Sequence, residues 1–423
     1  MASSPEAAPG PDAVAGSPQA CRYRARAWWG DDVVADSTAT LRLDRPGHSP
    51  SLWFPCTDVR WERFEEVTLG PALGAPLRCW SVPGDPAGEA VVSSHPDAGH
   101  EASWAKGFVT FDHDRVRVEL VDAGPSDDER DVTVKRFPTW GDAADLIDLL
   151  DVRQEDDATW VAGARSDWRR PVVEGSQMLG QAVVAASRHS AGRRIVSAHL
   201  VFPRVADARR AVRVHLDEVS AGRTFTTLGV RVTQRERCVA VGTLLLDETA
   251  DDLIRHTEPG PAVPTPYGSE PYDMGVTGRD LRIVDGAYTG DPNAPVGPPD
   301  LDAWVRFRDV PGDPALHAGL LAQFTGHLSI AAALRPHAGV GQHDAHRTLS
   351  TAINAIGLSF HAPIRADRWL LYHHHSTFAG DGMTRAEGHV HDGSGDLVAS
   401  FTVDAMVRAF PDGDPTPDPR VAL

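Results

Sequence analysis

Lysine is almost missing from this chain of 423 residues, because 39 of its 41 basic residues are arginine and only Lys106 and Lys135 are lysine. We attribute this bias to a GC-rich genome rather than to a binding site. Acidic residues outnumber basic ones by 59 to 41, and the formal net charge is -18. This surplus argues against nucleic acid or an anionic membrane as a partner, although a local arginine cluster can still hold an anionic small ligand.

Cysteine and long apolar runs are also scarce. The four cysteines have no CxxC spacing and are too few for a disulfide framework, so we expect a protein of the reducing cytoplasm. No apolar run approaches the roughly 20 residues that span a bilayer, so we expect no membrane helix. The N-terminal stretch has neither the basic region nor the apolar region of a secretion signal.

Composition divides the chain into several parts, as its length requires. Residues 1–20 and the tail 411–423 are rich in Ala, Pro, Ser or Asp, and we expect both to be disordered. Residues 22–122 show alternating apolar and polar positions and frequent turn signals, which predict a small β domain. A charged stretch opens the expected linker 123–142.

Six of the eleven tryptophans fall in this β domain: Trp28, Trp29, Trp53, Trp61, Trp80 and Trp104. They predict an aromatic core. The alternative is a stacking surface for a ligand.

Residues 143–410 contain an internal repeat. The Ala-rich helical pattern at 176–189 is similar to the one at 326–337, and each is followed by extended segments. Phe202 and Phe360 lie 158 residues apart, and so do Gly222 and Gly380. Each unit is therefore one apolar helix that covers one face of an antiparallel sheet.

The repeat predicts an α+β chain in which a small, mostly-β domain precedes a double hotdog fold, that is, two antiparallel sheets that each wrap a central helix. The first hotdog is expected over 143–250 and the second over 301–410. The Pro- and Gly-rich segment 251–300 is expected to be the crossover linker between them.

The duplicated part resembles the acyl-CoA thioesterase II family. The resemblance rests on the order and spacing of six motifs: GSQMLGQAVVAAS (175–187), FPRVAD (202–207), LRPH (334–337), SFHAPI (359–364), WLLYHHHSTFAGDGM (369–383) and LVASFTVDAMVR (397–408). It implies hydrolysis of acyl-CoA to a free acid and CoA, with no cofactor and no metal. It also makes a homodimer plausible.

The N-terminal block resembles the bacterial domain-of-unknown-function family four-two-seven. The similarity lies in VVADSTATLRL (33–43), LWFPCTDVRW (52–61) and GFVTF (107–111). That family usually carries a Cys-Pro-Tyr-Lys-Gly stretch, whereas residues 70–74 read Gly-Pro-Ala-Leu-Gly. We therefore expect a structural or docking module.

The thioesterase resemblance implies an Asp, a Thr and a Gln that together orient the attacking water. Without gaps these positions fall on Gly326, Ile353 and Val403. Shifts of one or two residues bring in polar neighbours instead: His327, Thr351 (or Asn354) and Asp404.

The substitute set could still hydrolyse a thioester. His327 can take a proton from water, Asp404 can fix its tautomer, and Thr351 can orient the water. Gly326, Asn354 and Gln177 are expected to contact the substrate, and the positive end of a helix can stabilise the developing oxyanion. The alternative is that His327 only caps its helix while Asp404 is solvated or salt-bridged.

In the first half, Glu174, Ser176 and Gln177 occupy the equivalent helix start. Glu174 could act as a base, as carboxylates do in single-hotdog thioesterases. The alternative, which we favour, is a favourable charge at the helix dipole with Ser176 as the N-cap.

Other residues carry weaker signals. His373 and His375 share a strand face, but two imidazoles make only half a zinc site, and we expect no metal. Cys238 has no partner signal for a catalytic thiol. Arginines that could meet CoA phosphates are Arg193, Arg194, Arg209, Arg210, Arg335, Arg365 and Arg368. The rival functions are a non-catalytic acyl-CoA binder or scaffold and a hotdog hydratase.

Overall fold

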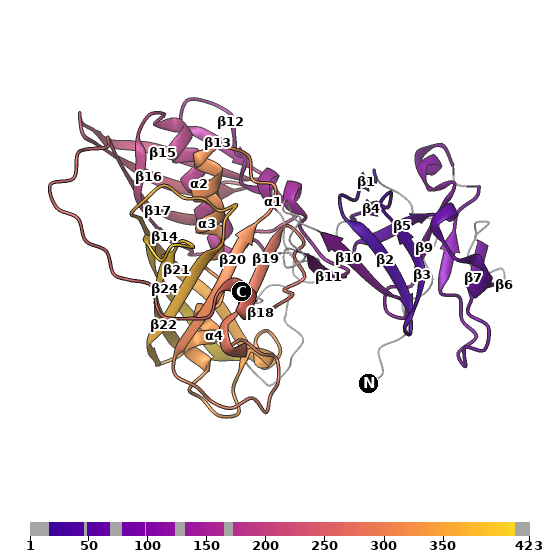
Figure 1. Ribbon diagram of the computed structural model, residues 1–423. Coiled ribbons are helices and arrows are strands. Elements are labelled where there is room, and N and C mark those ends of the chain that lie inside the picture. Colours follow the sequence, from indigo (N-terminus) through magenta and orange to yellow (C-terminus); the bar gives the residue numbers. More distant parts are fainter. Residues whose placement is uncertain are drawn as a thin grey trace. The chain divides into compact units, whose positions relative to one another are not determined.

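A computed structural model describes residues 17–45, 49–67, 78–97, 99–122, 132–164 and 172–410 (Figure 1). Of the stretches expected to be disordered, residues 1–16 of 1–20 and the whole tail 411–423 lie outside the described residues, as does the stretch 70–74. Gln19 and Ala20, at the end of the first stretch, form a short strand instead. The chain divides into two units, which are described separately. Unit 1 holds residues 1–140 with 275–277, and unit 2 holds the remainder.

Unit 1 contains two antiparallel sheets. The larger sheet has the strand order β1 (Gln19–Ala20), β4 (Leu41–Leu43), β5 (Ser51–Pro55), β9 (Phe108–Phe111), β8 (Val92–Ser94), β7 (Arg78–Ser81) and β6 (Glu65–Val67). The smaller sheet has the order β11 (Thr133–Phe137), β10 (Arg117–Asp122), β2 (Arg24–Trp29) and β3 (Asp32–Ser37).

The side chains of β10 show why the sequence forms this sheet. Val118 and Leu120 are fully buried, while Arg117, the first residue of the strand, is exposed. Apolar residues at every second position therefore face one core that both sheets share. The expected linker 123–142 also contributes to the unit, since β11 pairs with β10.

Unit 2 is built on one antiparallel sheet of thirteen strands (Figure 1). Its first half contributes β12 (Arg153–Gln154), β13 (Thr159–Ala162), β15 (Val212–Ala221), β16 (Phe225–Gln234), β17 (Arg237–Asp247) and β14 (Arg194–Val201), in that spatial order. The second half continues with β21 (Leu349–Phe360), β24 (Leu397–Ala409), β23 (Met383–His391), β22 (Leu370–Gly380), β20 (Asp300–Phe307), β19 (Arg279–Ile283) and β18 (Glu270–Pro271).

The strand order reads the same from the centre outwards in both halves. β14, β17, β16 and β15 on one side correspond to β21, β24, β23 and β22 on the other. β15 and β22 begin 158 residues apart, at Val212 and Leu370, and so do β16 and β23, at Phe225 and Met383. The predicted α+β double hotdog is confirmed, with the two sheets joined into one through the pairing of β14 with β21.

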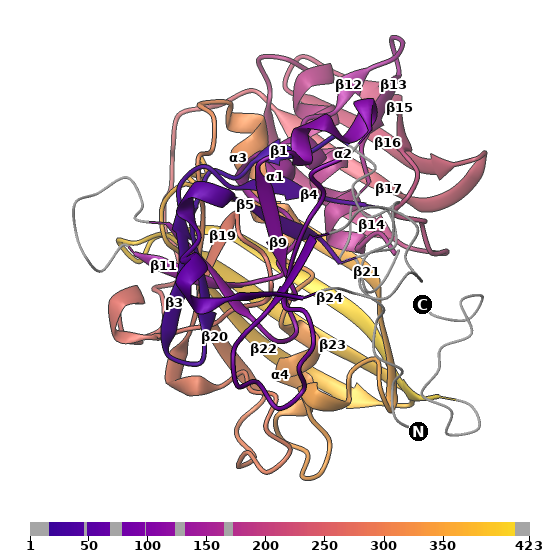
Figure 2. The same ribbon diagram turned by 90° about the vertical axis from the view of Figure 1, so that its right-hand side faces the viewer.

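In the described ranges, four α-helices accompany this sheet: α1 (Ala143–Leu150), α2 (Gly175–His189), α3 (Pro314–Phe324) and α4 (Ser329–Leu334). α2 packs on β14, β15, β16 and β17, and α4 packs on β20, β22 and β23 (Figures 1 and 2). α2 and α3 cross where Gly180 faces Gly319. A side chain would not fit there, because a Cβ on Gly180 would lie 2.6 Å from the carbonyl oxygen of Gly319. None of the helices in the described residues has the length and apolarity needed to cross a membrane.

The second-half helix differs from the expected pattern at 326–337. Helical structure begins earlier, at Pro314, and breaks into α3 and α4. The Thr325 hydroxyl bonds back to the carbonyl of Ala322, and Leu328 takes a left-handed φ of 67°. This turn places His327 between two helices rather than inside one.

The expected crossover linker 251–300 is partly sheet. It supplies β18 and β19, which extend the second half beyond β20. These strands were hidden in the sequence because Pro and Gly dominate the neighbouring residues.

Candidate functional site

The start of α2 meets the turn between α3 and α4. Glu174 is the N-cap of α2, and its side chain makes no capping hydrogen bond. A Cβ on Gly326 would lie 2.6 Å from the Ser176 hydroxyl oxygen, so only glycine lets the turn approach the helix this closely. The first amides of a helix have no acceptor within it, and they carry the positive end of its dipole. The second half thus presents its turn to the positive end of the first-half helix.

His327 occupies that turn and faces a carboxylate. Its Nε2 lies 3.5 Å from the Glu174 Oε2, and its ring stacks on Phe324 with a centroid separation of 4.7 Å. Only 10% of the His327 side chain is exposed, against 38% for Glu174. Burial lowers the pKa of His327 to about 4, with the Glu174 charge acting in the opposite direction. The imidazole is therefore neutral at physiological pH, and the contact with Glu174 is too long for a strong hydrogen bond.

A buried cation stands close to this pair. Arg279, on β19, is 2% exposed and lies over the Phe324 ring at 4.7 Å. Burial lowers its pKa to about 10, while the charge of Glu174 favours its protonated form. It is thus still cationic at neutral pH, and it supplies positive charge on the side of Phe324.

Several buried polar atoms around the turn have no hydrogen-bond partner within the described part of the chain. They are Glu174 Oε2, Gln177 Nε2, Gln323 Oε1, Ser329 Oγ and Asn354 Oδ1. Asn354 is the extra residue of a β-bulge between Ile353 and Ala355, and its backbone carbonyl accepts a hydrogen bond from Phe202. Buried polar groups are normally paired, so these atoms are candidates for contacts with a polar ligand.

The structure does not bring Asp404 to His327. The Asp404 carboxylate accepts a hydrogen bond from Arg385 at 2.9 Å, and both side chains are about 40% exposed. Neither ring nitrogen of His327 bonds to it, since Nε2 faces Glu174 and Nδ1 has no hydrogen-bond partner among the described residues. The reason is the alternation of β24: Val403 and Ala405 are buried, so Asp404 points to the opposite face.

The other expected residues divide between two places. Gln177 and Gly326 lie at the junction of α2 with the α3–α4 turn. Thr351 is buried, and its hydroxyl lies 3.3 Å from His346 Nε2, so the structure gives it a histidine other than His327 as its neighbour.

The three consecutive histidines have separate environments. His374 is fully buried, its Nδ1 lies 3.2 Å from the Leu301 carbonyl, and burial lowers its pKa to about 4. His373 lies 2.8 Å from Asp302, which raises its pKa. Among the residues the structure describes, no three His, Cys, Asp or Glu side chains are grouped as metal ligands.

Comparison with known proteins gives the same division of the chain. The acyl-CoA thioesterase N-terminal domain matches residues 164–246, and the acyl-CoA thioesterase C-terminal domain matches residues 257–407. Residues 18–122 match a domain of unknown function, DUF427. The chain belongs to the acyl-CoA thioesterase family. Members of this family are acyl-CoA thioester hydrolases, and the match spans both halves of the double hotdog.

Individual thioesterases are similar over the same region. Acyl-coenzyme A thioesterase 8 of Homo sapiens is 26% identical over 271 residues, which is 56% of this chain and 81% of the human protein. Acyl-CoA thioesterase 2 of Haemophilus influenzae is 24% identical and covers 62% of this chain and 96% of its own. The crystal structure of an acyl-CoA thioesterase II from Mycobacterium marinum has a TM-score of 0.53 and 25% identity, over 64% of this chain and 98% of its own.

At the positions where the family resemblance implies an Asp, a Thr and a Gln, the chain has Gly326, Ile353 and Val403. Sequence reasoning identified His327 and weighed Glu174, but it did not pair them. It missed Arg279, because that residue lies in the segment expected to be a linker. Only the turn glycine Gly278, directly before the first residue of β19, could have hinted at a strand there.

Proposed function

We propose that unit 2 hydrolyses an acyl-CoA thioester to a free acid and CoA at the Glu174–His327 pair. The observation that carries this proposal is the 3.5 Å approach of His327 Nε2 to Glu174 Oε2 beside the first turn of α2. A general base and an oxyanion-binding helix end are the two elements that water attack on a thioester needs.

In the proposed reaction, the thioester carbonyl oxygen accepts hydrogen bonds from the first amides of α2. A water molecule bonded to His327 Nε2 attacks the carbonyl carbon, and the imidazole takes its proton. The Glu174 carboxylate stabilises the imidazolium that forms. The tetrahedral intermediate then collapses, the C–S bond breaks, and the imidazolium returns the proton to the CoA thiolate.

His327 is neutral before the reaction, and the charge of Glu174 raises its pKa against the effect of burial. With a pKa of about 4, it holds a free lone pair at neutral pH. Arg279 adds a fixed positive charge that offsets the negative charge of Glu174 and of the developing oxyanion. Gln177 and Asn354 supply unpartnered amide groups that can orient the substrate.

The second candidate is an acyl-CoA binder without turnover. The observation in its favour is the loss of the polar set that the family resemblance implies, since Gly326, Ile353 and Val403 stand at those positions. The two candidates share the binding site and differ only in whether the thioester is cleaved.

Two assays on the purified protein distinguish these candidate functions. We expect release of free thiol from acyl-CoAs, measured with a thiol reagent across a panel of chain lengths. Calorimetric titration of the same acyl-CoAs provides the second readout. Binding without thiol release identifies the binder, and the absence of both rejects the site altogether.

A further inference from the structure

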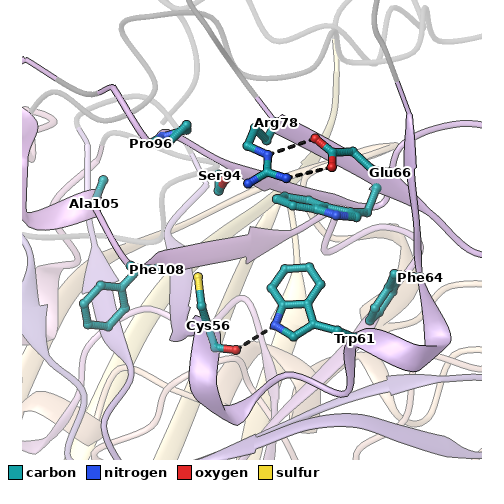
Figure 3. A pocket seen from close by; sticks show the side chains of 11 residues that line it. Cys56, Trp61, Phe64, Glu66, Arg78, Ser94, Pro96, Ala105 and Phe108 are labelled. Carbon is teal, nitrogen blue, oxygen red and sulfur yellow. Dashed lines mark hydrogen bonds and ion pairs between the residues drawn. The ribbon is translucent and has the colours of Figure 1, made fainter.

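The larger sheet of unit 1 carries a cavity of about 530 Å³ that the thioesterase reaction does not use (Figure 3). Small-molecule sites usually enclose about 300–1,000 Å³, so this one has room for a ligand. Strands β6, β7, β8 and β9 supply its wall, together with the short 3₁₀ turns Cys56–Asp58 and Trp61–Arg63.

Aromatic rings make up the walls of the cavity. The rings of Trp61 and Trp80 have their centroids 4.7 Å apart, and Phe64 packs edge-on against Trp61 at 6.3 Å. Trp61 is fixed in place because its Nε1 donates a hydrogen bond of 2.8 Å to the Cys56 carbonyl. Phe108 also lines the cavity, and Figure 3 shows the Cys56 thiol between it and Trp61.

Trp61, Trp80 and Phe108 are only partly buried, although the unit has an apolar core to receive them, whereas Phe64 belongs to that core. Trp61 and Trp80 pack against the core that the two sheets share, and Phe108 packs against a second cluster around Trp53. Each therefore turns part of its ring surface towards the cavity rather than into the core. Ring faces held at fixed positions around one hollow are typical of sites that bind flat ligands.

The charges at the cavity cancel each other. Arg78 donates two hydrogen bonds, of 2.9 and 2.7 Å, to the Glu66 carboxylate, and its guanidinium lies over Trp80 at 5.4 Å. Both charged groups are thus engaged with each other. No net positive charge is left on this pair to attract a phosphate or a carboxylate, so the pair favours a neutral ligand.

The thiol of Cys56 is also uncharged at neutral pH, because burial raises its pKa. It is therefore a soft, polarizable contact for a ligand. This agrees with the neutral character of the walls.

We infer that unit 1 binds an uncharged, planar aromatic or heteroaromatic small molecule, which stacks against the tryptophan rings of this cavity. The Ser94 hydroxyl and the outer edges of the Arg78–Glu66 pair can accept or donate hydrogen bonds at the rim. This assigns a binding role to the block that the sequence suggested was a structural or docking module. It also makes part of the tryptophan cluster the ligand-stacking surface that was the alternative to an aromatic core.

The test uses quinoline and indole as neutral planar probes and quinoline-4-carboxylate as a charged one. The readout is the rate at which iodoacetamide alkylates Cys56 in the full chain, followed by peptide mass spectrometry. Cys238 serves as an internal control, because it is also partly exposed but lies on β17 of unit 2. We expect a saturating neutral probe to slow Cys56 alkylation at least fivefold and to leave Cys238 unchanged, while the carboxylate protects much less.

Substitutions of tryptophan test whether the probe protects Cys56 by binding in this cavity. Trp80→Leu should abolish it, whereas Trp80→Phe, which keeps a ring, should retain most of it. The matched control is Trp28→Leu, because Arg117 lies over Trp28 at 5.0 Å in the smaller sheet, away from the cavity lining.

Three results would overturn the inference. They are no protection of Cys56 by either neutral probe, equal protection by the carboxylate, and protection that survives Trp80→Leu. The first applies to the unmodified chain, so the inference stays testable even if Trp80→Leu fails to fold.

Discussion

Acidic pH should lower the stability of unit 2, because this unit buries two histidines in their neutral form. The pKa of His327 and of His374 is about 4 in the folded chain, against an ordinary value of 6.5. Between these values the unfolded chain binds a proton that the folded chain does not, so stability is complete above pH 6.5 and falls as the pH drops towards 4. At pH 5 each histidine should cost about 2 kcal/mol, or about 4 kcal/mol together, at 1.36 kcal/mol per pH unit.

The assay is urea unfolding of the full chain at pH 7 and pH 5, compared with His374→Gln and with His375→Gln. His374 is fully buried and His375 is exposed, so these neighbours on β22 form a matched pair. We expect His374→Gln to reduce the loss on acidification by about 2 kcal/mol, and His375→Gln, which removes an exposed imidazole beside Asp300, to bring no such reduction. His373 acts in the opposite direction, since Asp302 raises its pKa, but it is present in all three proteins. Equal acid sensitivity of wild type and His374→Gln would refute the reasoning.

Two further substitutions test the packing and the site. Gly180→Ala should destabilise the chain by about 1–3 kcal/mol in the same urea assay, because its Cβ would meet the Gly319 carbonyl at 2.6 Å, while Gly163→Ala, with nothing within 4 Å, should change little. Equal effects of Gly180→Ala and Gly163→Ala would show that α2 and α3 can move apart without a loss of stability. Asp404→Asn should keep kcat within about twofold and stability within about 1 kcal/mol, because the carboxylate only forms a half-exposed ion pair with Arg385. A tenfold loss of thiol release in this variant would restore Asp404 to the reaction.

Local patterns were sufficient to predict most strands of unit 2. Strands β15 and β16 alternate between buried and less buried positions and end in glycine or polar turns, and both signals are readable from neighbouring residues. The constant spacing of 158 residues then revealed the duplication, because insertions between the halves do not disturb spacing within each half.

The site was harder to predict because it depends on contacts between distant segments. His327 and Glu174 come from different halves, and the turn at Leu328 that brings them together has a left-handed φ, which the sequence does not announce. Asp404 failed as a partner for a reason that the sequence does contain. It sits one position away from the inward-facing Val403, and a shift of one residue on a strand reverses the face.

The central claim is that His327 and Glu174 activate water as one unit, and a double-mutant cycle measures it most directly. We would compare thiol release from one acyl-CoA by the wild type, His327→Gln, Glu174→Gln and the double variant. Each single change should lower kcat by about 10²-fold with little change in KM, and the double variant should be no more than about fivefold worse than either, because residues that act together are not additive. Two independent losses that multiply, or a single variant that keeps more than half of the wild-type turnover, would contradict the account.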